Sequence, residues 1–310
     1  MEQSKIDRIN ALAKKAKTEG LTEAETAERK ALREEYIAAY RKNLRTQLDN
    51  MVIVEPNGER RKLKPKKQAK EGILMLYKYE MHVHDSLCSH CGHNPPEVIA
   101  KVYYDRGYAG MCFTNHFLQG STAIDKTLPW EDKVRAYWNA YLRVKDWAKD
   151  KDFDILFGLE HHYGSGKEVL TYGIDLDFLL AHPNIDVAPI KDYCDAVHEA
   201  GGFISQAHPF RRAPYIDPNV LPQPELLDAA EIYNAGNSDE DNSRGYDFAK
   251  ENHLYGTSGG DTHEQHESNI GKAGMAFPYR IKTEKELANA LFRHDGRCII
   301  NGVIQPPQDI

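Results

Sequence analysis

Short apolar runs that end in a histidine or a carboxylate recur along most of this chain. Such runs, bounded by turn residues, are typical of buried strands, and helical patterns fall between most of them. The pattern therefore predicts an α/β fold built from repeated β-then-α units. The six runs and the residues that follow them are 73–77 with His82 and His84, 111–115 with His116, 155–159 with Glu160, 178–181 with His182, 203–207 with His208, and 255–260 with Asp261 and His263.

The endings of these runs carry the candidate chemistry. In a parallel barrel the carboxyl ends of the strands converge on one face, where the active site lies. Side chains that can bind metals at six such ends are therefore expected to meet. His82 and His84 are two residues apart, so both imidazoles point to the same side of an extended strand. Glu160 has two oxygens and can bridge two cations.

The first 70 residues have a different pattern, which predicts two helices and a basic tether. Gly20 ends the first helix, and Thr22 with Glu25 forms a capping box that starts the second. A turn at 56–58 precedes a run of basic residues that is typical of a solvated linker. The apolar stripes of the two helices are Ile6, Ile9, Leu12 and Ala16, and then Leu32, Tyr36, Tyr40, Leu44 and Leu48.

The charge of the chain divides in the same place. Residues 1–70 hold 18 Lys and Arg against 11 Asp and Glu, a net +7, whereas the remaining 240 residues hold 22 against 36, a net −14. The acidic part lacks the broad basic surface that binds long nucleic acid. A chain of 310 residues can bury one barrel plus an appendage. We therefore predict a helical hairpin at 1–55, a basic linker at 56–72 and a barrel at 73–310.

The sequence also bears on the location of the protein. No stretch approaches the roughly 18 apolar residues of a membrane helix, and the first ten residues lack the apolar core of a signal peptide. The five cysteines are odd in number and scattered, which favours reduced thiols in the cytosol over a disulfide framework. We expect a cytoplasmic protein without a membrane partner. Its oligomeric state and the partner of the hairpin stay open.

Residues 6–58 closely resemble a known family. The stretch that begins IDRINALAKKAKTEGLTEAETAERK and ends at the turn is similar to the YnzC-like family of short bacterial proteins of unknown function, which form a helical hairpin. This resemblance implies the hairpin fold and no activity.

The motifs from residue 73 onward resemble the polymerase-and-histidinol-phosphatase (PHP) superfamily of metal-dependent phosphoesterases. They are HxH with a histidine six residues later, TNH, GLE, DFLLAH, AHPF and a final DxH. The resemblance implies a distorted (β/α)7 barrel, three divalent metal ions and a ligand at each motif. Asp85 stands where relatives commonly carry Thr, which puts its immediate surroundings in doubt. The implied ligands are His82, His84, His90, His116, Glu160, His182, His208, Asp261 and His263.

Such a site implies hydrolysis of a phosphate ester. Adjacent divalent ions lower the pKa of a bridging water and clamp the attacking and leaving oxygens. Imidazole and carboxylate ligands suit Zn, Mn or Fe better than Mg. We expect the phosphomonoester of a small metabolite or nucleotide as substrate, with Arg211 or Arg212 holding a phosphate oxygen. The residues expected to act in catalysis are Glu160, Asp261, His208 and Arg211.

Two other functions stay open at this point. One is a nucleic-acid phosphodiesterase or exonuclease in which the basic residues 1–70 deliver the strand, although the acidic barrel weighs against it. The other is a regulatory module that keeps metal without turnover, although the intact ligand set weighs against it. Substrate selection is expected from the loops. Residues 118–150, with all three tryptophans, are more typical of helix packing than of base stacking, and 211–224 is long enough to form a rim.

Several further residues lie close to the implied ligands. Cys88 and Cys91 form a CxxC motif, but a structural zinc site needs a second such pair, so we favour buried thiols beside the site. Asn234 ends another predicted strand at 231–234 and is expected to point near the site. The histidines beside implied ligands are His93, His161 and His162, and those expected on helices or loops are His198, His253, His266 and His294.

Overall fold

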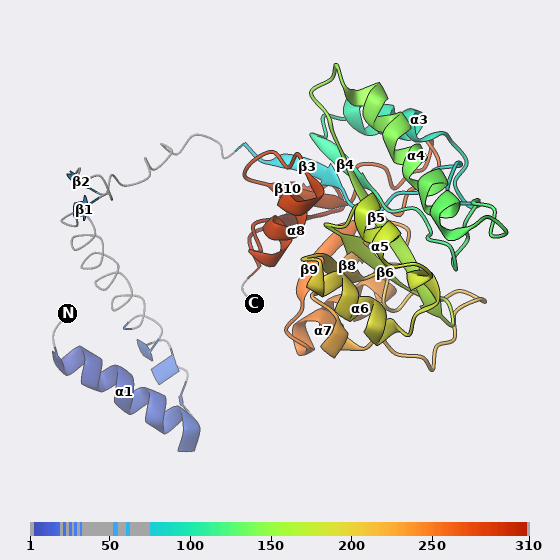
Figure 1. The fold of residues 1–310 in the computed structure, drawn as a ribbon. Helices are drawn as coiled ribbons and strands as arrows, with labels where there is room; N and C mark the ends of the chain where they lie inside the picture. Colours follow the sequence, from blue (N-terminus) through green and yellow to red (C-terminus); the bar gives the residue numbers. More distant parts are fainter. Residues whose placement is uncertain are drawn as a thin grey trace. The chain divides into compact units, whose positions relative to one another are not determined.

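The computed structural model describes residues 3–18, 21–22, 25–26, 28–29, 32, 52–54, 60–62 and 75–308. The chain divides into two units, Met1–Ile73 and Leu74–Ile310, and each has its own fold (Figure 1). Among the described residues, no helix is long and apolar enough to cross a membrane.

The N-terminal unit begins with helix α1 (Gln3–Thr18), which ends before Gly20 as predicted. The predicted capping box is present. The backbone N–H of Thr22 donates to Glu25 Oε2 (2.9 Å), and that of Glu25 donates to Thr22 Oγ1 (3.2 Å). These reciprocal bonds satisfy two donors at the start of the next helical segment.

Two short strands follow in this unit, β1 (Val52–Val54) and β2 (Arg60–Lys62). They pair antiparallel, with Val54 opposite Arg60. Residues 60–62 were predicted as part of the basic linker and are strand instead, because they pair with β1. The turn predicted at 56–58, and the stripe predicted along the second helix beyond Leu32, lie outside the described residues.

The second unit is built on a ten-stranded mixed sheet in the order β12-β11-β10-β3-β4-β5-β6-β7-β8-β9. Strands β3, β4 and β5 are parallel, β6 runs against both of its neighbours, and β7, β8 and β9 are parallel again. The strands are β3 (Tyr77–Glu80), β4 (Gly110–Phe113), β5 (Asp154–Gly164), β6 (Lys167–Tyr172), β7 (Phe203–Gln206), β8 (Ala229–Asn234), β9 (Tyr255–Gly259), β10 (Gly274–Phe277), β11 (Arg297–Ile300) and β12 (Val303–Ile304).

Helices surround this sheet (Figure 1). Helix α3 contacts β4, α4 contacts β5, α6 contacts β7, and α7 contacts β8 and β9. Both faces of the central strands are buried: Ile155 and Phe157 join the apolar core that includes α3 and α4, while Leu156 between them joins a second core. The helices are α3 (Pro96–Asp105), α4 (Trp130–Ala148), α5 (Leu176–Ala181), α6 (Ile190–Glu199), α7 (Asp239–Glu251) and α8 (Glu284–Phe292), with short 3₁₀ turns at Ile185–Val187 and Pro224–Leu226.

Predicted strands are confirmed as β4, β5, β7, β8 and β9. The run predicted at 73–77 overlaps β3 only at Tyr77, and the strand predicted at 178–181 is wrong. These residues lie in helix α5, because the Asp175 side chain caps the helix by accepting a hydrogen bond from the N–H of Phe178 (3.0 Å). Strand β6, which was not predicted, forms an antiparallel hairpin with β5. Residues 164–166 between them all have positive φ, as a tight turn requires. The strict alternation of a (β/α)7 barrel is therefore broken at this hairpin.

The sheet curls until the chain beyond β3 meets the chain beyond β9. Val83 and Thr262 form an isolated parallel bridge, and the N–H of His84 donates to the carbonyl of Thr262 (2.9 Å). We call this junction the seam. It brings the histidines that follow β3 beside the residues that follow β9.

A buried carboxylate reinforces the seam. Glu80 Oε1 accepts hydrogen bonds from the backbone N–H groups of Met81 and His82 (both 2.9 Å) and of Gly260 (2.6 Å). Burial raises the pKa of Glu80 to about 7, although these N–H donors oppose the increase. One side chain thus fixes the backbone that leads into His82 and the backbone that leads into Asp261.

Candidate metal centre

Most of the implied ligands gather at the carboxyl ends of the strands. Of these, His82, His84 and Glu160 are completely buried. We call the gathered residues the site cluster, and its members are His82 and His84 after β3, His116 after β4, Glu160 in β5, His208 after β7, and Asp261 and His263 after β9.

Glu160 lies at the centre of the site cluster. Its Oε1 is 3.1 Å from Nε2 of His208 and 3.2 Å from Nε2 of His82, and its Oε2 is 2.9 Å from Nδ1 of His116. Burial raises the pKa of Glu160, but the charges of His82 and His116 outweigh burial and hold that pKa well below its ordinary value. Glu160 is therefore an anion that faces three imidazoles.

Asp261 connects the site cluster to Arg211. Its Oδ1 is 3.2 Å from Nε2 of His84 and 3.4 Å from Nε2 of His82, and its Oδ2 accepts a hydrogen bond from Arg211 Nη2 (2.5 Å). Burial raises the pKa of Asp261, but Arg211 and His82 lower it well below its ordinary value. Asp261 has a φ of 52° and His208 a φ of 25°. Non-glycine residues rarely adopt such angles, and strained backbone of this kind is concentrated at functional sites.

The two histidines after β3 lie in opposite electrostatic surroundings. Burial lowers the pKa of His82, but the neighbouring carboxylates of Asp261 and Glu231 raise it well above its usual value. Burial also lowers the pKa of His84, and the neighbouring His116 lowers it further, to about 3. The ring of His84 is therefore neutral and keeps a lone pair for a ligand.

Glu231 of β8 holds two of the gathered residues in place and was not among the predicted site residues. Its Oε1 is 3.0 Å from Nδ1 of His82, and its Oε2 accepts a hydrogen bond from the backbone N–H of His208 (2.8 Å). Asn234, which was expected to point near the site, donates to the same Oε2 (3.0 Å). A carboxylate on the far nitrogen of a metal-binding histidine fixes the orientation of its ring.

Four buried atoms at the centre of the site make no directed hydrogen bond, although each lies at ion-pairing distance from another member of the site cluster. They are Nε2 of His82, Nε2 of His84, Nδ1 of His116 and Oε2 of Glu160. Buried polar atoms are nearly always hydrogen-bonded, so four that face one another without a directed hydrogen bond need an explanation. Imidazole nitrogens and carboxylate oxygens are the donors that divalent transition metals take, and the set therefore fits such ions.

Four groups of side chains are close enough to share an ion. Within each group the ligand atoms lie within 4.8 Å of one another. The groups are His82, Glu160 and His208; His82, His84 and Asp261; His116, Glu160 and Glu168; and His84, Cys91, His116 and His263.

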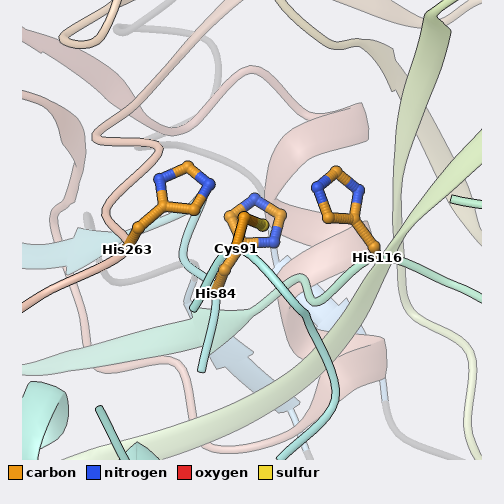
Figure 2. A group of neighbouring side chains, drawn as sticks. All are labelled: His84, Cys91, His116 and His263. Atoms are coloured by element: carbon orange, nitrogen blue, oxygen red, sulfur yellow. The ribbon is translucent and has the colours of Figure 1, made fainter. Parts of the chain in front are cut away.

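Cys91 joins the last of these groups, and the implied ligand His90 does not (Figure 2). The side chain of His90 is exposed, and its backbone N–H donates to the carbonyl of Ser121 (2.7 Å), so the next residue faces the site. Burial raises the pKa of Cys91, but hydrogen bonds to His116 and His263 lower it to about 7.

His182 also lies apart from the site cluster. It follows helix α5, where its Nδ1 donates to the carbonyl of Phe178 (2.8 Å). The residue was placed at a strand end, and because the segment is helical its side chain is not carried to the site. Glu168 of β6 supplies a carboxylate instead, with Oε1 3.1 Å from Nδ1 of His116. Sequence reasoning missed Glu168 because it missed β6.

The two histidines that follow Glu160 in β5 point in different directions. His161 is buried and stacks on Tyr193 of α6, with ring centroids 3.9 Å apart. Side chains alternate along a strand, so His161 faces away from Glu160. His162 faces the same side as Glu160, accepts a hydrogen bond from the N–H of Gly166 (3.2 Å) and lines the pocket above the site.

That pocket has a volume of about 460 Å³ and contains members of all four groups. Gln119 and Tyr215 complete its rim. A larger pocket of about 580 Å³ lies between α7 and the C-terminal residues, but none of its lining residues belongs to the site cluster. We therefore take the smaller pocket as the one that bears on chemistry.

The two arginines that were predicted to hold phosphate differ in their position relative to this pocket. Arg211 lines it, with Nε bound to Asn237 (2.8 Å) and Nη2 bound to Asp261. Arg212 is exposed and pairs with Glu240 (2.8 Å) on α7. Only Arg211 is placed to contact a molecule in the pocket.

The N-terminal segment matches known bacterial proteins. Residues 4–67 match the family described as bacterial protein of unknown function, DUF896. A UPF0291 protein of Oceanobacillus iheyensis is 46% identical over 59 residues, which are 19% of this chain and 77% of that protein. UPF0291 proteins of Halalkalibacterium halodurans (50% over 58 residues) and Listeria monocytogenes (46% over 59 residues) each align with 19% of this chain and with 73% and 79% of their own lengths.

Solved structures align with most of the chain at low identity. PsfC of Pseudomonas syringae has a TM-score of 0.48 and 15% identity over 69% of this chain and 87% of its own. A protein of Bifidobacterium adolescentis described as a metal-dependent phosphoesterase has a TM-score of 0.44 and 14% identity over 70% of this chain and 96% of its own. A lesion-specific endonuclease of Pyrococcus furiosus has a TM-score of 0.44 and 12% identity over 71% and 56%.

Proposed function

This chain belongs, through its N-terminal segment, to the DUF896 family of bacterial proteins of unknown function, and we propose that its second unit is a metal-dependent hydrolase of phosphate esters. The observation that carries this proposal is the set of buried donor atoms without a directed hydrogen bond on His82, His84, His116 and Glu160. A purely structural network would be expected to direct hydrogen bonds between them. The sequence motifs that resemble PHP phosphoesterases give the same assignment independently.

Each part of the site has a role in this proposal. Divalent ions, when bound, supply Lewis acidity that activates water and neutralises a phosphate group. We propose three ions, of Zn, Mn or Fe, because the donors are nitrogen, oxygen and one sulfur. Glu160 contributes to two of the four groups and would be the carboxylate that holds more than one ion. Glu231 orients the ring of His82 and holds the backbone of His208. The seam holds the segment that carries His82 and His84 beside the segment that carries Asp261 and His263.

Arg211 is the proposed contact for the substrate phosphate. Its Nε and Nη2 are bound to Asn237 and Asp261, which fixes the guanidinium plane at the pocket wall. A guanidinium held in this way can donate to a phosphate oxygen through its remaining N–H groups. The pocket volume of about 460 Å³ suits a small phosphorylated metabolite or nucleotide. The net −14 of residues 71–310 weighs against long nucleic acid as the substrate.

The test is hydrolysis of an aryl phosphate monoester and of the matching diester by protein of known metal content. We expect turnover by the metal-loaded chain and none by the Glu160→Ala, His208→Ala double variant. The His198→Gln variant is the matched control, because the His198 side chain is exposed on α6, forms an ion pair with Asp228 and does not line the pocket. A fully loaded chain that hydrolyses neither ester, nor any member of a nucleotide, sugar-phosphate and single-stranded DNA panel, would favour the regulatory module.

A further inference from the structure

One position in the site differs in kind from the others. The three groups that contain Glu160 or Asp261 each combine imidazole with carboxylate, whereas the fourth combines three imidazoles with the thiol of Cys91 and has no carboxylate. We call Cys91, His116 and His263 the thiol side (Figure 2). His84 lies against it, with its ring stacked on that of His263 at a centroid distance of 4.6 Å.

The loop that carries Cys91 is built to hold it there. The buried Asp85 accepts hydrogen bonds from the N–H groups of Leu87 (2.8 Å) and Cys88 (3.2 Å), which closes a turn just after His84. Gly92 then approaches the backbone of Asp85 so closely that a Cβ would lie 2.3 Å from its carbonyl carbon. The turn and the glycine together fix the path of the chain on either side of Cys91.

Buried atoms without a directed hydrogen bond also point to a ligand on this side. Nε2 of the buried His84 and Nδ1 of His116 make no directed hydrogen bond, although both lie at ion-pairing distance from carboxylates of the site. The sulfur of Cys91 lies within 4.8 Å of ring nitrogens of His84, His116 and His263. The three imidazoles can therefore supply nitrogen ligands to an ion, and the sulfur of Cys91 lies close enough to bind the same ion.

We propose that Cys91 is a thiolate ligand of a metal ion that it shares with His116 and His263. This inference rests on the proposed function only in requiring that the site binds metal. Thiolate sulfur selects zinc and similar thiophilic ions over Mg²⁺, Ca²⁺ and Mn²⁺, so this position takes a different class of ion from its neighbours. The sulfur stands where the PHP-like motif implied a histidine.

The number of donors bears on what this ion can do. Nε2 of His84 lies 3.2 Å from Asp261 Oδ1 as well, so it serves either the thiol side or the neighbouring position. When it serves the neighbour, Cys91, His116 and His263 provide three protein ligands. A zinc ion with three protein ligands keeps a fourth place for water or substrate, as catalytic zinc sites do.

The test uses cobalt, because Co²⁺ bound to a thiolate has a sulfur-to-metal charge-transfer absorption in the near ultraviolet that oxygen and nitrogen ligands do not give. The full-length apoprotein is titrated with Co²⁺. We expect the band to grow until the sites are filled. We expect Cys91→Ser to lose the band and to bind about one ion fewer per chain.

Cys88→Ser is the matched control within the same CxxC motif. Cys88 is buried, and its sulfur donates to the carbonyl of Tyr137 (3.6 Å), a contact that a hydroxyl can replace. This variant is expected to keep the band. Iodoacetamide provides a second readout, since Cys91 lines the pocket and should be alkylated in the apoprotein and protected by metal.

Two results would overturn the inference: a cobalt-loaded wild type without the band, or a band that persists in Cys91→Ser. Equal alkylation of Cys91 with and without metal would also contradict it. These readouts do not depend on turnover. A band with no hydrolysis of any ester would refute the proposed function and leave the thiolate ligand intact, and hydrolysis without the band would do the reverse.

Discussion

The two sides of the site cluster hold their imidazoles in different ways. On the carboxylate side, which we define as His82, Glu160, His208 and Asp261, anions surround the rings and raise the pKa of His82. His84 lies against the thiol side, between the rings of His116 and His263, and burial together with the neighbouring His116 lowers its pKa to about 3. The comparison shows that one pocket can offer hard, anionic positions and a soft, nearly neutral position a few ångströms apart.

Glu160→Gln changes the carboxylate side and is expected to give the largest decrease in kcat. The substitution keeps the shape of the side chain but removes the charge that faces His82, His116 and His208. We expect kcat to fall by about 10³-fold, or ~4 kcal/mol, because several kcal/mol of charge stabilisation would depend on the ions that Glu160 is proposed to hold. Steady-state kinetics measures this change. The same protein should keep the cobalt band of the thiol side, and an unchanged kcat would remove Glu160 from the mechanism.

Removing metal from both sides of the site is expected to lower the stability of the folded chain. An ion held at 100 times its Kd stabilises the folded chain by about 2.7 kcal/mol, which corresponds to a shift of about 5–10 °C in Tm for a unit of this size. We expect a chelator to lower the Tm of the wild type by at least that amount, as measured by calorimetry. The decrease should be smaller in Cys91→Ser, by roughly the share of one ion. Equal decreases in the two proteins would place no ion on the thiol side.

Arg211→Gln should weaken substrate binding and also remove the partner of Asp261 on the carboxylate side, while the thiol side stays intact. Hydrogen bonds to charged groups contribute about 1.5–3 kcal/mol, so we expect kcat/KM on the preferred ester to fall by about 10- to 100-fold. The neighbouring Arg212→Gln is the control, because Arg212 is exposed and binds Glu240 outside the pocket. Steady-state kinetics should show the decrease in kcat/KM for Arg211→Gln and not for Arg212→Gln. Equal decreases in kcat/KM would indicate that both arginines stabilise the loop and that neither contacts the substrate.

The smallest effect is expected from His198, an exposed histidine–carboxylate pair that serves as a reference for the buried ones. A hydrogen bond to Asp228 raises the pKa of His198. The pair therefore contributes stability below the unfolded pKa of about 6.5, and this contribution is lost as the pH rises through the higher folded pKa. His198→Gln should cost at most ~0.5 kcal/mol at pH 5.5, because the pair is solvated, and nothing at pH 8.5. Denaturant unfolding at the two pH values tests the sign.

Strand positions were predictable from the sequence where local signals agreed. The apolar run at 155–159 is buried on both faces as β5, and its carboxyl end carries Glu160 to the site. The run at 178–181 looked the same, but Asp175 three residues earlier is a helix cap, and its hydrogen bond to Phe178 favours the helix. Short apolar runs do not distinguish the two structures without such a cap.

Ligands on strands were more predictable than ligands on loops. The spacing of His82 and His84 follows the period of a strand, and the structure brings both to the cluster. Beyond Asp85 the chain turns, and whether His90 or Cys91 faces the site depends on hydrogen bonds within that turn. Glu168 lies in a fully buried six-residue strand, and the Gly164-Ser165-Gly166 turn directly before it is the local signal that could have marked the hairpin.

The seam has a consequence for how the site takes up and releases ions. Glu80 binds backbone N–H groups of the segments that follow β3 and β9, so the segments that carry His82 and Asp261 are joined through the protein alone. The entropy cost of bringing these distant segments together is met when the chain folds. We therefore expect the amide hydrogens of His82 and Gly260 to stay protected from solvent exchange when a chelator is added.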